Sequence, residues 1–254
     1  MKVISILFSL AFFSLVSTFG IQSLRAQAGG PPMLTNDSGT PDPGTWENNF
    51  PFVFEGSKDI YTLEGPVVDI NYGFNEKIQL TVEFPWVKEK GQPVANKLDN
   101  ITFGAKYRFH EDSNGYSAST FPAAIISLNT PSADGRKVHY GFFLPLAIGK
   151  TFGPYGINGQ VGYEWLAHTK HVVYGVDVSR EFGESLVLLL ELHGELEKIE
   201  EDDPFLNAGN FINLGAQIKL TEMFTLLTAV GKGLSPDEFG NPTYYAYCGL
   251  QLIM

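Results

Sequence analysis

From Trp46 to Met254 the chain alternates apolar residues with polar or small residues, in segments of about ten residues. In the segment IQLTVEFPW (78–86) the even positions are apolar, and Gln79, Thr81 and Glu83 stand between them. Successive side chains of a β-strand point to opposite faces, so each segment has one apolar and one polar face. No convincing helical period appears in this region. The pattern therefore predicts an all-β fold whose strands separate an apolar environment from a polar one.

The first 28 residues have the layout of a secretory signal peptide. Lys2 precedes a long apolar run, and Ala26 and Ala28 form an A-x-A cleavage site. We expect residues 1–28 to be removed after Ala28 during export; the alternative is an uncleaved membrane helix. Beyond this point no apolar stretch is long enough for a spanning helix, so a mature chain in a membrane must form a closed barrel.

Charge and cysteine content exclude several classes of protein. Loss of Lys2 and Arg25 with the signal leaves 15 of the 17 basic side chains against 28 acidic ones. Nucleic acid is therefore not an expected partner, because phosphate binding needs a basic surface. The single cysteine, Cys248, cannot form an internal disulfide, so backbone hydrogen bonds and packing must hold the exported chain together. Without a cysteine at the cleavage site, a lipoprotein anchor is not expected.

Twelve segments show the alternation, an even number as in single-chain bacterial outer-membrane barrels. They cover about 45–55, 64–74, 78–86, 99–109, 116–129, 139–150, 155–165, 171–181, 186–197, 211–220, 224–233 and 243–254. Connections after even-numbered segments are short, whereas those after odd-numbered segments are mostly longer and more polar. This sorting predicts an antiparallel up-and-down transmembrane β-barrel over 45–254, with short periplasmic turns and longer extracellular loops. Residues 29–44, rich in Gly and Pro, are expected to be a periplasmic extension or a partial plug.

A short phrase recurs as NYGFNEKIQL (71–80), REFGESLVL (180–188) and IKLTEMFTL (218–226). If the apolar residues before and after each Glu both face lipid, an odd number of residues must separate them. The phrase therefore predicts three-residue hairpin turns on the periplasmic side. The paired residues would be Phe74 with Ile78, Phe182 with Leu186, and Leu220 with Phe224.

Large aromatic residues stand near the expected strand ends. Trp46 opens the first segment, Trp86 and Trp165 close the third and seventh, and Tyr244 opens the last. Amphipathic rings collect where a membrane meets water, so these four residues are expected to form part of an aromatic girdle. The alternative is that the tryptophans are ordinary core residues.

Three stretches resemble a known family of bacterial outer-membrane proteins. GGPPMLTNDSGTPDPGTWE, VVDINYGFNEKIQLTVEFPW and LDNITFGAKYRF are similar to the N-terminus and early strands of the MetA-pathway of phenol degradation family, often called transporters. Asn36 and Ser38 depart from that family's pattern, and the chain ends in Ile253 and Met254 rather than in an aromatic residue. The resemblance implies an outer-membrane location and uptake of small molecules of aromatic or hydrophobic character.

The polar face of the alternation predicts which side chains line the lumen. Acidic residues outnumber basic ones there, and an ion pair of Glu83 with Lys106 or Arg108 would either brace the wall or select a solute. The candidate pore-lining residues are Asp69, Glu83, Lys106, Arg108, Glu164, Asp177, Glu191, His193, Glu195, Lys219, Tyr245 and Tyr247.

Catalytic and metal sites are not expected. His193, flanked on its face by Glu191 and Glu195, is the one candidate base for a lipid hydrolase, but no serine stands in a nucleophile motif. Glycines in GKTFGPYGINGQVGY match no phosphate loop. The acidic loop with residues 200–203 lacks the ligand spacing of a calcium loop and is expected to be a solvated loop. No cofactor is expected.

The sequence therefore predicts an outer-membrane channel or transporter for passive uptake of small molecules. Expected partners are outer-membrane lipid and lipopolysaccharide, the solute, and, during biogenesis, the barrel-assembly machinery and periplasmic chaperones. Two alternatives stay open: a structural or surface-interaction barrel with a closed lumen, and an outer-membrane lipid hydrolase.

Overall fold

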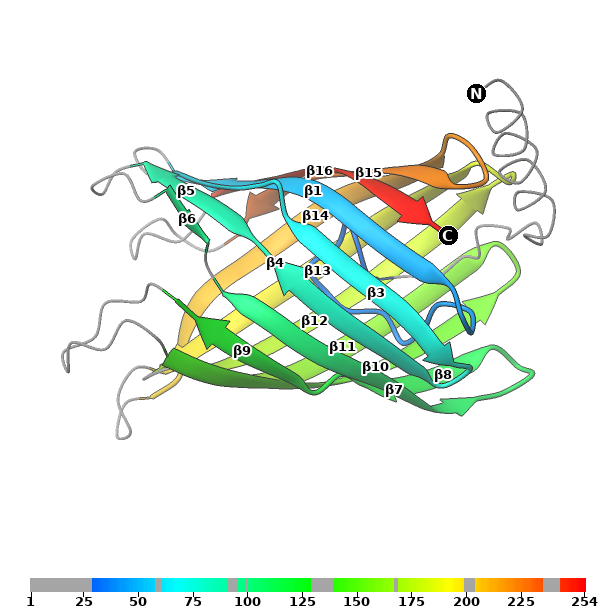
Figure 1. The fold of residues 1–254 in the computed structure, drawn as a ribbon, viewed down its shortest axis with the longest axis horizontal. Coiled ribbons are helices and arrows are strands. Elements are labelled where there is room, and N and C mark those ends of the chain that lie inside the picture. Colours follow the sequence, from blue (N-terminus) through cyan, green and yellow to red (C-terminus); the bar gives the residue numbers. More distant parts are fainter. Residues whose placement is uncertain are drawn as a thin grey trace, which may run out of the picture.

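The computed structural model describes residues 29–57, 61–90, 96–98, 100–128, 139–166, 169–198, 204–234 and 243–254. Every regular element in these ranges is a β-strand, and the strands form one antiparallel sheet that closes into a barrel (Figure 1). In the described part of the chain, no helix has the length and apolarity needed to cross a membrane. The expected signal peptide and the acidic loop at 200–203 lie outside the described residues.

The barrel wall consists of twelve staves, where a stave is one span of the wall from rim to rim within the described ranges. Eight staves are single strands; the other four combine β2 with β3, β4 with β5, β6 with β7, and β8 with β9. This count confirms the twelve predicted segments. The bounds are β1 Trp46–Gly56, β2 Tyr61–Glu64, β3 Val68–Asn75, β4 Ile78–Phe84, β5 Trp86–Lys90, β6 Asn96–Leu98, β7 Ile101–Glu111, β8 Tyr116–Thr120, β9 Ala123–Ser127, β10 His139–Phe152, β11 Tyr155–Leu166, β12 Thr169–Phe182, β13 Leu186–Lys198, β14 Leu206–Lys219, β15 Phe224–Gly233 and β16 Tyr244–Ile253.

Pairing of the first and last strands closes the wall. β1 lies antiparallel to β16 from Glu47 opposite Ile253 to Gly56 opposite Tyr244. Closure gives the backbone donors and acceptors of both strands a partner, so neither remains a sheet edge. Three of the divided staves are interrupted at proline, namely Pro66, Pro85 and Pro122, because proline has no N–H to donate to a neighbouring strand.

The two faces of the wall have the predicted compositions. Large apolar side chains point outward, and Leu80, Val161 and Leu190 remain 44%, 52% and 43% exposed on the isolated barrel. Their inward neighbours, such as Gln79 and Gln160, are buried. An outer surface of this kind requires a lipid environment rather than water.

Two of the three predicted hairpin turns are confirmed. Phe182 pairs with Leu186 across three residues, and Leu220 donates its N–H to Phe224 O across three residues at 2.8 Å. The prediction for the first turn is wrong, because Asn75 rather than Phe74 pairs with Ile78. Phe74 forms a β-bulge, and the Asn75 side chain accepts hydrogen bonds from the N–H groups of Lys77 and Ile78. The asparagine therefore completes a two-residue turn.

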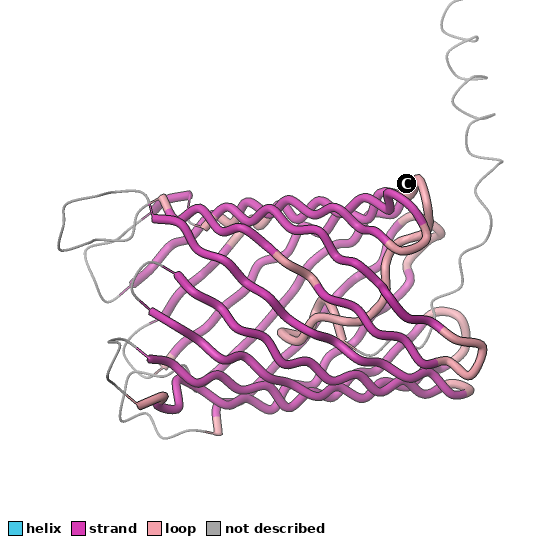
Figure 2. Tube along the Cα trace, turned by 90° about the horizontal axis from the view of Figure 1, so that it is seen from below, coloured by secondary structure: helices cyan, strands magenta, loops and turns pink. Residues whose placement is uncertain are grey.

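The two rims of the barrel differ. At one rim, here called the turn rim, described connections of two to four residues reverse the chain, such as 153–154 between β10 and β11. Trp46 and Met254 exchange two backbone hydrogen bonds at this rim, so the start of β1 lies beside the end of the chain. Figure 2 shows these turns and the C-terminus at the same end. The opposite end is called the loop rim.

Candidate functional site

Residues 29–42, here called the inner segment, lie inside the barrel rather than beside it (Figures 1 and 2). Thr35 is fully buried, and Ser38 is 4% exposed. The segment turns back on itself where Gly30 N–H donates to Thr35 O and Met33 N–H donates to Gly30 O, both at 2.8 Å. Its glycine, proline and threonine content gives no periodic pattern, so local turns and contacts with the wall must hold its shape.

The central part of the inner segment is hydrogen-bonded to β11 and β13. Thr35 N–H donates to Glu191 Oε1 at 2.6 Å, and Asn36 N–H donates to Gln160 Oε1 at 2.8 Å. Asn158 Nδ2 donates to Asn36 O at 2.9 Å. Polar side chains of the wall thus take the place of water for the backbone of the segment.

Further contacts tie both ends of the segment to other staves. Tyr245 OH donates to Pro32 O at 3.1 Å and Gln217 Nε2 donates to Pro31 O at 2.9 Å. Further along the segment, the Lys106 ammonium pairs with Asp37 at 2.9 Å. Ser38 Oγ lies 2.6 Å from Ser117 Oγ, and Thr40 Oγ1 donates to Glu76 O at 3.3 Å. The segment therefore contacts the wall from β14 and β16 round to the first turn.

Glycines on the inner wall make room for the segment. A Cβ atom at Gly175 of β12 would overlap Thr35 Oγ1, and one at Gly215 of β14 would overlap the Met33 methyl group. Any larger residue at these two positions would occupy the volume in which the segment sits.

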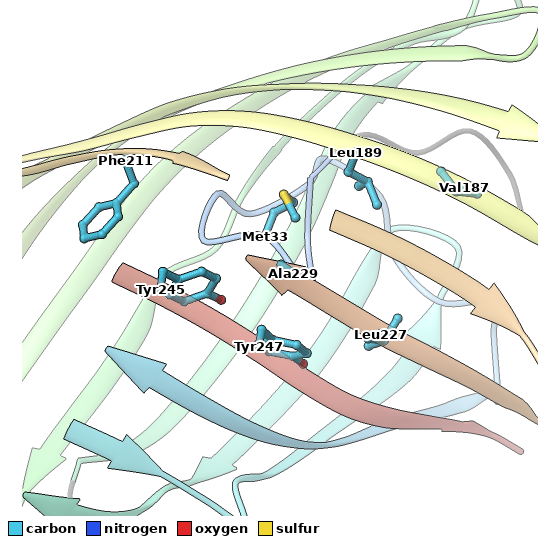
Figure 3. Close-up of a cluster of buried hydrophobic side chains, with 8 residues drawn as sticks. All are labelled: Met33, Val187, Leu189, Phe211, Leu227, Ala229, Tyr245 and Tyr247. Atoms are coloured by element: carbon cyan, nitrogen blue, oxygen red, sulfur yellow. The ribbon is translucent and has the colours of Figure 1, made fainter. Parts of the chain in front are cut away.

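An apolar cluster fixes the segment on the β13 to β16 side. The Met33 side chain lies among inward-facing residues of the wall (Figure 3). The cluster comprises Met33, Val187, Leu189, Phe211, Leu227, Ala229, Tyr245 and Tyr247. Because Val187 and Leu227 are completely buried, this part of the lumen is filled.

The other side of the lumen is open. A cavity of about 450 Å³ lies between the inner segment and the wall formed by β1, β2, β3 and β4. Its acidic lining residues are Asp37, Glu47, Glu55, Glu64, Asp69 and Glu83, and its basic one among the described residues is Lys106. Its apolar and aromatic lining includes Met33, Leu34, Val53, Val67, Phe121, Phe143, Tyr245 and Tyr247.

The candidate pore-lining residues occupy three different environments. Asp69, Glu83, Lys106, Tyr245 and Tyr247 line the cavity. Asp177 and Glu191 are completely buried beside the inner segment, and His193 Nδ1 lies 3.3 Å from Thr35 Oγ1. Glu195 contacts His171, and His171 of β12 lies directly opposite Glu164 of β11 in the sheet. Arg108 and Lys219 lie at the turn rim, where they pair with Glu111 at 3.2 Å and Glu222 at 3.0 Å.

The ion pair expected for Glu83 is not formed. Lys106 pairs with Asp37 and Arg108 pairs with Glu111, so neither cation reaches Glu83. The expectation fails because Asp37 lies in a segment that the alternation does not place, and this segment brings the Asp37 carboxylate to Lys106 inside the lumen.

The aromatic residues expected at strand ends all point outward. Trp46, Trp86, Trp165 and Tyr244 are between 43% and 57% exposed on the isolated barrel. Trp46 lies at the turn rim, where its ring contacts that of Tyr72 in a tilted arrangement at a centroid distance of 4.6 Å. Trp165 lies next to the last residue of β11, close to the loop rim, and Tyr244 begins β16 at the same rim.

Three cavity carboxylates were not among the expected lumen residues. Glu47 and Glu55 alternate with outward-facing phenylalanines along β1, and Glu64 ends β2. In WENNFPFVFEG, Phe50, Phe52 and Phe54 define the outward face. The alternation therefore indicates that Glu47 and Glu55 face the lumen. In the described part of the chain, no three His, Cys, Asp or Glu side chains are arranged to hold a metal ion.

No protein-family profile matches this chain, and no curated protein matches it. Several solved structures share its fold. The COG4313 outer membrane channel from Pseudomonas putida F1 is 11% identical with a TM-score of 0.65, over 85% of this chain and 97% of that chain. The KdgM porin is 12% identical with a TM-score of 0.58, over 81% of this chain and 98% of that chain. At these identities the similarity establishes the fold: the chain is a closed antiparallel β-barrel of the kind found in outer-membrane proteins.

Proposed function

We propose that the chain is a passive channel for small molecules in a bacterial outer membrane, and that solutes move through the cavity beside the inner segment. The observation that carries this proposal is the one-sided filling of the lumen. The inner segment is hydrogen-bonded to β11, β13, β14 and β16 and is paired with Lys106 of β7, whereas about 450 Å³ stays open along β1 to β4. Small organic solutes fit a space of this size, and large ones do not.

The lining of the cavity suggests a class of solute. Glu47, Glu55, Glu64, Asp69 and Glu83 face the space from the wall, whereas Lys106 is already paired with Asp37. A pathway lined by carboxylates raises the local concentration of cations and repels anions. Because Tyr245, Tyr247 and Phe143 line the same space, we propose that cationic molecules with an apolar or aromatic body pass best.

Two similarities bear on this choice of solute. The resemblance of the N-terminus and early strands to the MetA-pathway of phenol degradation family supports uptake of aromatic or hydrophobic compounds. One solved structure of the KdgM porin holds disordered oligogalacturonate. The acidic cavity of the present chain does not favour an acidic sugar polymer, so we expect a different solute despite the common fold.

The inner segment acts in this proposal as a partial plug, and residues 1–28 act as a cleaved export signal. The turn rim then faces the periplasm, the loop rim faces the exterior, and the outward aromatic residues lie at the two membrane surfaces. Lipid and lipopolysaccharide would contact the outer wall, and the barrel-assembly machinery with periplasmic chaperones would insert it.

An enzymatic function is less well supported. The hydroxyl group in contact with His193 belongs to Thr35, which is completely buried under the wall at Gly175. A buried hydroxyl cannot reach a lipid substrate, so we propose that His193 has a structural role.

Liposome swelling and bilayer recordings test the proposal together. Liposomes that contain the purified mature protein should swell in isotonic arabinose faster than protein-free liposomes. In planar bilayers, benzylammonium should carry more current than benzoate, which has a similar size and the opposite charge. No swelling and no current would instead support a structural barrel with a closed lumen. Faster passage of benzoate would contradict the proposed class of solute.

A further inference from the structure

Two carboxylates are buried together without a cation. Asp177 of β12 and Glu191 of β13 are directly opposite each other, and both are 0% exposed. Glu191 accepts hydrogen bonds from Thr35 N–H and Asn213 Nδ2. Asp177 Oδ2 lies 3.3 Å from Asn158 Nδ2, but its Oδ1 has no hydrogen-bond partner among the described residues. Two like charges facing each other in a buried site are unfavourable unless one of the groups is protonated or a positive charge lies nearby.

The described cations do not supply that charge. Among the ion pairs of the described residues, none joins a lysine or arginine to Asp177 or Glu191, and Lys106 is paired with Asp37. His193 contacts the Thr35 hydroxyl rather than either carboxylate. The Asp177 site therefore contains an acceptor atom that is fully buried and lacks a donor.

The start of the inner segment lies at this site. Gly29 is buried, and a Cβ atom on it would lie 3.2 Å from Asp177 Oδ2 and 2.7 Å from Asn158 Nδ2. Standard bond lengths put the nitrogen of Gly29 about 2.5 Å from that Cβ position, and so within about 6 Å of Asp177 Oδ2. Opposite charges at this separation interact strongly when both are shielded from water.

We propose that the α-ammonium group of Gly29, formed when the signal peptide is removed, binds the Asp177 carboxylate and fastens the inner segment in the lumen. Hydrolysis of the bond between Ala28 and Gly29 consumes one water and leaves a carboxylate on Ala28 and an ammonium group on Gly29. In the precursor the same nitrogen is an uncharged amide. Export processing thereby creates the missing cation at the place where the wall carries two buried anions.

This inference does not depend on whether the barrel conducts solutes. It explains why a buried carboxylate of the wall lies near the first residue after the expected cleavage site while one of its two oxygens has no donor. It also predicts that the position of the new N-terminus matters, because one added residue would move the ammonium group by up to about 3.8 Å.

The test begins with the mass of the mature protein purified from the outer membrane, which should correspond to a chain starting at Gly29. A variant with one serine inserted between Ala28 and Gly29 should then be exported and cleaved, with the serine as its first residue. Its melting temperature, followed by the heat-induced mobility shift in gels, should fall by about 5 °C or more. In the Asp177→Asn background the same insertion should change the melting temperature by less than about 1 °C.

Chemical modification gives a second readout that needs no substitution in the barrel. The Gly29 amine of the folded wild-type protein should react with an acylating reagent at neutral pH at least about tenfold more slowly than that of the unfolded chain.

Glu184→Gln, at a turn tip, is the control for the insertion experiment. In that protein the inserted serine should lower the melting temperature as much as it does in wild type. A different mature N-terminus, a fully reactive amine, or an equal effect of the insertion in the Asp177→Asn protein would overturn the proposal.

Discussion

Asp37 of the inner segment and Lys106 of β7 form an ion pair at 2.9 Å, with side chains only 17% and 6% exposed. Both residues also line the open cavity. The pair therefore stands at the boundary between the filled and the open parts of the lumen, and it links the segment to a stave opposite the β13 contact. Loss of this link should release the segment on the side where solutes are proposed to pass.

Replacing Lys106 with methionine should loosen the inner segment and increase the noise of the single-channel current. The change leaves the Asp37 carboxylate partly buried without its partner, which costs about 3 kcal/mol in comparable sites. Single-channel recordings should show larger and more frequent current steps than wild type. Lys150→Met is the matched control, because Lys150 contacts Tyr116 near the turn rim and does not touch the segment. Equal noise in both variants would argue against the anchoring role.

Gly175→Val should displace the segment from the opposite side. The valine side chain would occupy the volume of the Thr35 hydroxyl, so Thr35 and its hydrogen bond to Glu191 must move. We expect the mean conductance to rise at least about twofold, while the barrel keeps its heat-induced gel shift. In the control Gly159→Val, a Cβ atom meets nothing closer than 3.7 Å, and the conductance should stay unchanged. Unchanged conductance in Gly175→Val would contradict the proposed plug.

Glu83→Gln should weaken the preference of the channel for cations. Removing one charge about 6 Å from a passing ion changes its energy by roughly 0.7 kcal/mol in water, or about threefold in permeability. The potassium to chloride permeability ratio from reversal potentials measures this effect. Glu184→Gln at a turn tip removes the same charge outside the lumen and should leave the ratio as it is.

The turn between β7 and β8 should make a pH-dependent contribution to stability. Asp112 accepts a hydrogen bond from Tyr116 N–H at 3.0 Å, which lowers the pKa of its carboxyl group below the usual value. A lowered folded-state pKa means that the contribution is present above the unfolded pKa of about 4 and is lost as the pH falls through the folded-state pKa. Asp112→Ala should therefore lower the urea midpoint at pH 7 and have little effect at pH 2. An equal loss at both pH values would assign the effect to packing instead.

Alternation in the sequence was sufficient to predict the strands, their number and the outward face. Leu80 and Val161 belong to series of apolar residues at every second position. Side chains at alternate positions of a strand point to the same face, so the series marks the outward face. The first turn could not be predicted in the same way, because the bulge at Phe74 shifts the register by one residue and the Asn75 side chain caps the shorter turn. Bulges depend on local hydrogen bonds that the period does not encode.

The inner segment was the main structural feature that the sequence did not place. Its composition offered both a periplasmic extension and a plug, since glycine and proline specify turns but not their location. One signal was present at the wall: in LVLLLEL (186–192) Val187 and Leu189 break the alternation with inward apolar residues. An apolar residue facing a lumen needs a cover, and here Met33 supplies it.

The reversal potential of the mature protein in a tenfold gradient of potassium chloride tests the central claim most directly. A passage beside the inner segment, lined by Glu47, Glu55, Asp69 and Glu83, should conduct and should favour potassium over chloride by more than about threefold. A barrel that carries no current, or one that favours chloride, would contradict the account.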